Sequence, residues 1–164
     1  IFTDFAVGMP ADAGGARVRL LVHPEKHFKY GDIEFAYPRY FTFESDLSEP
    51  KVRLWSLSGR QTVIMVQRYP VKLHHKTMAE QLIIGFGGDK SSLGFCELSV
   101  NNKTTDGSRV ITRIGIGTIS QEVYSFDLAE GSLLLIVQDN IVNDRNSDEY
   151  KVIRNLLSKT LKFN

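Results

Sequence analysis

The 164-residue chain has almost no cysteine, and this limits its chemistry. Its single thiol, Cys96, cannot form a disulfide within the chain or supply a zinc site built from several thiolates. Cys96 falls on the apolar side of a strand predicted over residues 95–100, where thiols usually act as small hydrophobic fillers. A disulfide within the chain and a cysteine-based zinc site are therefore excluded, and a catalytic thiol is disfavoured.

The chain also lacks an excess of charge and a long apolar run. It carries 20 Lys and Arg against 19 Asp and Glu, a net charge of +1, and these basic residues form no long run. Nucleic-acid binding needs clustered basic residues, so it is disfavoured. The longest apolar stretch, residues 133–137, is far shorter than the roughly 18 residues that cross a bilayer. We expect no nucleic-acid partner and no transmembrane segment.

Motifs for catalysis and phosphate binding are missing as well. The segment GFGGDKSS at residues 85–92 is rich in glycine, but Asp89 rather than glycine precedes Lys90, and a helix rather than a strand precedes it. The chain has no Gly-x-Ser-x-Gly nucleophile motif and no pair of carboxylates whose spacing demands catalysis. We predict that the protein is not an enzyme and uses no cofactor.

What is present is the composition of an ordinary globular domain, with 42% hydrophobic and 24% charged residues. GMPADAGGA at residues 8–16 has little to bury, so we expect residues 1–16 to be a flexible leader and residues 17–164 to form a single domain. The sequence begins with Ile1 rather than Met, which we interpret as a removed signal peptide or a trimmed start. The first explanation would make the protein periplasmic or otherwise exported.

Apolar residues at alternate positions predict a series of strands separated by hairpin-length loops. The predicted strands cover residues 17–23, 32–38, 40–45, 51–57, 62–68, 95–100, 109–117, 122–128 and 132–138. Because the loops are short, the sheet should be largely antiparallel. The runs 63–66 and 132–138 are apolar on both faces, which favours a sheet covered on both sides.

Two helices complete the predicted fold. Thr77 and Glu80 have the spacing of a capping box, and an apolar stripe of Ala79, Leu82, Ile83 and Phe86 follows. Asn146 and Glu149 give a second helix start, followed by Tyr150, Ile153, Leu156, Leu157 and Leu161. We therefore predict an α+β fold: a single-domain α/β/α sandwich with a largely antiparallel sheet and helices on both faces.

The four histidines are weak candidates for a metal site: His23, His27, His74 and His75. The i, i+4 spacing of the first pair would align both side chains only on a helix, and Pro24 makes a helix there unfavourable. Adjacent residues in an extended chain point in divergent directions, so His74 and His75 do not converge by themselves. A histidine-based metal-binding protein is one alternative function, and a small-ligand-binding domain is another.

The first third of the chain is rich in aromatic residues. Alternation buries only one face of a strand, so the second face is either covered by a helix or free to meet a partner. If it is free, the expected contact residues are Tyr30, Tyr37, Tyr40 and Trp55. We therefore predict a non-catalytic protein-binding or accessory domain whose partner is another protein.

Three segments resemble the PsbP-like family: IEFAYPRYFTFES, KTMAEQL and GSLLLIVQDNIVNDRNSDEYKVIRNLLSKTLKF. The resemblance spans residues 28–163 and lies mainly in the order of the elements. It implies an antiparallel sheet between helices. It also implies docking onto another protein without chemistry, as in extrinsic photosystem subunits, a nuclear GTPase-binding protein, bacterial envelope lipoproteins and secretion chaperones. No functional residue of the family can be transferred, and a fold likeness alone is a weak guide to function.

Overall fold

The computed structural model describes residues 4–8, 17–21, 23–86 and 90–164. The described chain contains two helices, α1 (His75–Gly85) and α2 (Asp148–Thr160). The strands are β1 (Asp4–Gly8), β2 (Arg17–Leu21), β3 (Glu25–Tyr30), β4 (Ile33–Pro38), β5 (Thr42–Asp46), β6 (Arg53–Ser58), β7 (Thr62–Tyr69), β8 (Ser91–Val100), β9 (Lys103–Ile114), β10 (Gly117–Asp127), β11 (Ser132–Ile141) and β12 (Lys162–Phe163).

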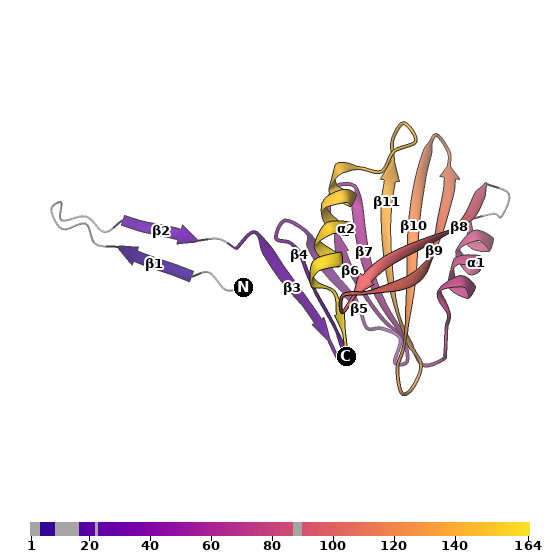
Figure 1. The fold of residues 1–164 in the computed structure, drawn as a ribbon, viewed down its shortest axis with the longest axis horizontal. Coiled ribbons are helices and arrows are strands. Elements are labelled where there is room, and N and C mark those ends of the chain that lie inside the picture. The colour runs from indigo at the N-terminus through magenta and orange to yellow at the C-terminus, as the bar shows by residue number, and fades with distance from the viewer. Residues whose placement is uncertain (1–3, 9–16, 22, 87–89) are drawn as a thin grey trace.

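A seven-stranded antiparallel sheet forms the body of the molecule, in the order β5-β6-β7-β11-β10-β9-β8 (Figure 1). β11 lies at its centre, where Leu135 is opposite Tyr124 of β10 and Val66 of β7. The turn before β11 requires glycine, because Gly131 has a φ of +84° and a Cβ there would lie 1.9 Å from the Tyr69 carbonyl oxygen. The apolar run predicted as a fully buried strand is therefore the middle of this sheet.

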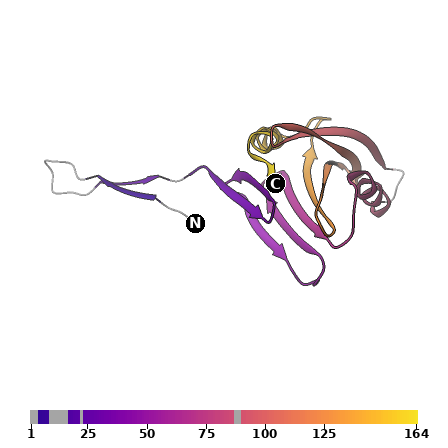
Figure 2. The same ribbon diagram turned by 60° about the horizontal axis from the view of Figure 1, so that its bottom comes forward.

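A second layer covers one face of the large sheet, which we call the core face. It consists of α2 and a three-stranded antiparallel sheet in the order β12-β4-β3. Figure 2 shows the large sheet curved, with α2 and the small sheet next to each other along it. Side chains from both layers form one continuous core, including Phe35 of β4, Leu135 of β11 and Ile153 of α2.

The other helix, α1, lies on the outer face against β8, β9 and β10. Ala79 is its only buried side chain, while Leu82 and Ile83 are half-buried. Ile84 is 68% exposed. α1 is therefore attached to the sheet by a narrow strip of contacts.

The predicted α/β/α sandwich, with a layer of helices on both faces, is wrong, because of the two described helices α1 alone touches the outer face and covers only a narrow strip of it. Strands account for 56% of the structure and helices for 17%, and the second layer is a small antiparallel sheet joined by one helix. The sequence pattern failed because it predicted that the aromatic strands at residues 32–45 would belong to one sheet. Instead β4 pairs with β3 and β12, while β5 pairs with β6.

Both predicted helix starts are shifted. The first helix begins before Thr77, and His74 is its N-cap: the Lys76 amide donates a 3.3 Å hydrogen bond to His74 Nδ1. Ser147, rather than Asn146, caps α2 by accepting from the Tyr150 amide at 3.0 Å. In each case a polar side chain other than the one that the spacing suggested accepts the hydrogen bond from a free amide of the first turn.

Part of the predicted leader forms a strand, since β1 pairs antiparallel with β2 over residues 4–8 and 17–21. Residues 1–3 and 9–16 of that leader lie outside the described residues. No helix in the described chain has the length and apolar character needed to span a membrane.

Candidate functional site

The histidines do not assemble a metal site in the described chain. His23 and His27 are exposed, the second of them on β3, whereas His74 and His75 lie where α1 begins. The described residues contain no group of three or more His, Cys, Asp or Glu side chains arranged to hold a metal ion. The metal hypothesis therefore has no ligand set in the described structure.

His74 and His75 have structural contacts at the start of α1. Their rings lie 4.0 Å apart, and His75 Nδ1 is 2.9 Å from Ser108 Oγ on β9. Burial lowers the pKa of His75 below its ordinary 6.5, and His74 adds to this effect, whereas Asp106 opposes it. A neutral His75 thus attaches the helix start to the sheet.

The four predicted aromatic contact residues fall in different environments. Tyr37 is 6% exposed and Trp55 is 8% exposed, so both belong to the core. Tyr30 is half-buried, and Tyr40 is 56% exposed with its hydroxyl donating to Glu149 Oε2 at 3.0 Å. A partner can reach Tyr30 and Tyr40 directly, but not the other two rings.

Four rings instead pack together between the two sheets, in tilted and edge-to-face contacts, and we call this cluster the aromatic seam: Phe28, Tyr30, Phe43 and Trp55. The Trp55 ring centroid lies 4.2 Å from that of Tyr30 and 5.9 Å from that of Phe28. Phe43 lies 6.4 Å from Phe28 and remains 50% exposed. The seam connects β3, the edge of the small sheet, with β5, the edge of the large sheet.

β5 is an open edge with an acidic character. All five of its residues are exposed, and β6 is its only neighbour among the strands described. Residues 42–49 include Glu44, Asp46 and Glu49 and no basic residue. The register places Phe43 opposite Leu57, on the core face, so Glu44 and Asp46 point to the outer face.

A hollow of about 230 Å³ lies on the outer face beside β5. Its base includes Leu54 and Met65, and Glu44 and Asp46 stand at its rim. An apolar base with a carboxylate rim suits the side chain of lysine or arginine, which combines an apolar stem with a cationic head.

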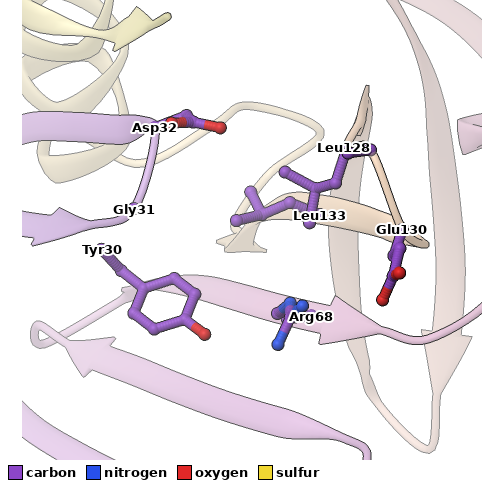
Figure 3. A pocket seen from close by; sticks show the side chains of 8 residues that line it. Tyr30, Gly31, Asp32, Arg68, Leu128, Glu130 and Leu133 are labelled. Atoms are coloured by element: carbon purple, nitrogen blue, oxygen red, sulfur yellow. The ribbon is translucent and has the colours of Figure 1, made fainter.

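A larger pocket of about 500 Å³ opens at the end of the aromatic seam, between the β3–β4 turn, β7 and the β10–β11 turn. Its lining comprises Tyr30, Gly31, Asp32, Arg68, Leu128, Ala129, Glu130 and Leu133. Figure 3 shows the Arg68 side chain between Tyr30 and Glu130, below Leu133. The pocket therefore combines an aromatic wall, an apolar floor and a guanidinium.

A buried polar network under α2 has a different character. Glu122 is 3% exposed and accepts hydrogen bonds from the hydroxyls of Tyr124, at 2.8 Å, and Tyr150. Arg154 Nη1 lies 3.1 Å from the Glu122 carboxylate. Burial raises the pKa of the nearby Cys96 thiol to about 11, so at neutral pH this group is a thiol rather than a nucleophilic thiolate. The network fixes α2 to the sheet.

The sequence alone did not reveal the pairing of Arg53 with Arg68 or the position of β5 at the edge of the sheet. Arg53 and Arg68 are opposite each other in β6 and β7, a relation that only the strand register reveals. The exposure of β5 depends in turn on its place at the end of the sheet, which its own residues do not encode. The acidic run at residues 44–49 was the one available signal.

A scan against protein-family models found no match, and a search of curated proteins also found none.

Proposed function

We propose that this is a non-catalytic domain that binds an extended, basic segment of another protein along β5. The observation that carries the proposal is the combination of an open strand edge, an acidic outer face and the half-exposed ring of Phe43. An open edge offers unpaired backbone N–H and C=O groups to a partner strand.

Side-chain alternation supplies the specificity in this proposal. A partner strand added to β5 would place alternate side chains beside Glu44 and Asp46, next to the hollow with the apolar base. Its other side chains would lie next to Phe43 at the aromatic seam. The favoured partner sequence therefore alternates basic and apolar residues.

The test uses short labelled peptides and fluorescence anisotropy. One peptide alternates lysine and valine, a second alternates glutamate and valine, and a third contains the lysine and valine residues in blocks. We expect the alternating lysine peptide to bind at least about tenfold more tightly than the other two, with affinity falling as salt rises. Equal affinity for the lysine and glutamate peptides would refute the charge argument.

Variants locate the binding surface. Phe43→Ala and the double variant Glu44→Lys, Asp46→Lys should each weaken the alternating lysine peptide at least about tenfold. Glu25→Lys makes the same kind of charge change on β3, the edge strand of the small sheet, and should leave the affinity within about twofold. If Phe43→Ala binds like the unmodified protein while Glu25→Lys does not, the binding edge is β3 and the proposal for β5 fails.

A small-ligand-binding domain is the second candidate function, and the Arg68 pocket is the observation that favours it.

A further inference from the structure

Arg68 of the pocket and Arg53 on the neighbouring strand form a pair of like charges. Arg53 and Arg68 are directly opposite each other in the antiparallel pairing of β6 with β7, and both are half-buried. Like charges in such a cross-strand pair repel each other. The arrangement therefore costs free energy unless an anion offsets it.

The described part of the chain places no carboxylate within ion-pair distance of either guanidinium. Among the described residues, neither guanidinium makes an ion pair within 4.0 Å or a side-chain hydrogen bond. Other arginines differ: Arg154 pairs with Glu122 at 3.1 Å, and Arg109 Nη2 donates to Asn146 Oδ1 at 2.7 Å. Since a guanidinium has five N–H donors, Arg68 keeps its full capacity for an acceptor that enters the pocket.

The other residues that line the pocket indicate the shape and polarity of the rest of the ligand. Leu133, which is 1% exposed, and half-buried Leu128 give the pocket an apolar floor, and the Tyr30 ring gives it an aromatic wall. The volume of about 500 Å³ lies within the usual range for small-molecule sites, roughly 300–1,000 Å³. Asp32 and Glu130 are exposed at the rim and would repel a ligand with several negative charges.

We propose that the Arg68 pocket binds a small organic molecule that carries one carboxylate on an apolar body. Arg68 binds the carboxylate with its paired N–H groups, a geometry that guanidinium and carboxylate share. Arg53 adds positive charge from the neighbouring strand, and Tyr30, Leu128 and Leu133 cover the apolar body. This site adjoins the aromatic seam through Tyr30 but differs from the protein-binding edge, because no residue of β5 lines the pocket.

The binding test uses a matched set of probes. 3-Phenylpropionate has the carboxylate and the apolar body, 3-phenylpropan-1-ol has the body alone, and inorganic phosphate has charge alone. Trp55 is the only tryptophan, and its ring lies 4.2 Å from Tyr30 of the pocket, so its fluorescence reports on occupancy. We expect 3-phenylpropionate to bind at least about tenfold more tightly than the alcohol or phosphate.

Variants test whether Arg68 is the anchor. Arg68→Ala and Arg68→Gln should each weaken 3-phenylpropionate at least about tenfold, and the glutamine variant serves if the alanine variant does not fold. Arg113→Ala removes an exposed arginine from β9 and is the matched control, while Phe43→Ala should change peptide binding but not this affinity. In the unmodified protein, chemical-shift changes should appear at Tyr30 and Leu128. Equal binding of acid and alcohol, no binding in the millimolar range, or unchanged affinity in both Arg68 variants would each overturn the proposal.

Discussion

The α2 interface and the aromatic seam differ in how far their side chains are buried and in whether their polar groups have partners. Under α2, the buried Glu122 is surrounded by hydroxyl and guanidinium donors, and Ile153 and Leu157 are completely buried. At the seam, Phe43 stays half-exposed beside an open strand edge, and in the pocket at the end of the seam Arg68 has no acceptor among the described side chains. The polar groups under α2 have hydrogen-bond and ion-pair partners within the protein, which stabilises the fold. The exposed ring and the guanidinium without a described acceptor are instead the features that we propose to bind other molecules.

The largest loss of stability should follow from removal of the buried Glu122 carboxylate. Glu122→Ala leaves Arg154 without its ion-pair partner and removes the acceptor of the Tyr124 and Tyr150 hydroxyls, which should cost about 3–5 kcal/mol of unfolding free energy. Urea denaturation measures the loss. Glu97→Ala is the control, because its exposed side chain changes while its backbone carbonyl can still accept from Arg154. A loss below about 1 kcal/mol would show that the network does not hold α2.

Neighbouring positions on α2 separate the buried face of the helix from its exposed face. Ile153 is fully buried, so Ile153→Ala should cost about 2–5 kcal/mol. Val152 is 56% exposed, so Val152→Ala should stay within about 0.5 kcal/mol. Thermal or urea unfolding of both variants gives the comparison, and similar losses for both would contradict the burial of this face.

Glu149 should make the start of α2 sensitive to acid. Burial raises the pKa of Glu149, but hydrogen bonds from the backbone amides of residues 60–62 and from the Tyr40 hydroxyl outweigh burial, so the pKa lies below its ordinary 4.5. A lowered carboxyl pKa gives stability that is present above about pH 4.5 and is lost as the pH falls through the folded-state value.

Glu149→Gln should remove this part of the acid dependence and cost about 1–2 kcal/mol at neutral pH, because three amides lose a charged acceptor. Unfolding free energies measured between pH 3 and pH 7 provide the test. Glu44→Gln removes a carboxylate from exposed β5 and is the control. An unchanged pH profile in Glu149→Gln would contradict the assignment.

The smallest effect on stability is expected at α1, at a pH higher than that at which Glu149 acts. Burial, assisted by His74, lowers the pKa of His75 below its ordinary 6.5. Stability from neutral His75 is therefore present above about pH 6.5 and is lost as the pH falls through the lower folded-state value. Hydrogen exchange of α1 should accelerate between about pH 7 and pH 5, after correction for intrinsic rates, while α2 remains protected. His75→Gln should abolish this difference, and His27→Gln should not.

The sequence predicted the local elements better than their assembly. The central strand at 132–138, the antiparallel pairing and the two helices follow from apolar periodicity, which reports on neighbours along one element. The small sheet could not be predicted this way, because β12 pairs Lys162 with Glu34 across a long separation in the sequence, and residues 25–30, which form β3, have no clear apolar alternation. The seam likewise depends on which strands end each sheet. The arginine pair could not be foreseen because it needs the register of β6 with β7.

The most direct test of the account measures stability and binding together in two variants. Phe43→Ala should lose less than about 1 kcal/mol of unfolding free energy, because the ring is 50% exposed, yet bind the alternating lysine peptide at least about tenfold more weakly. Ile153→Ala should lose about 2–5 kcal/mol and, under conditions where it is folded, bind the peptide as the unmodified protein does. If Phe43→Ala instead binds normally, or if both variants lose binding in proportion to their stability, the seam is not the binding surface.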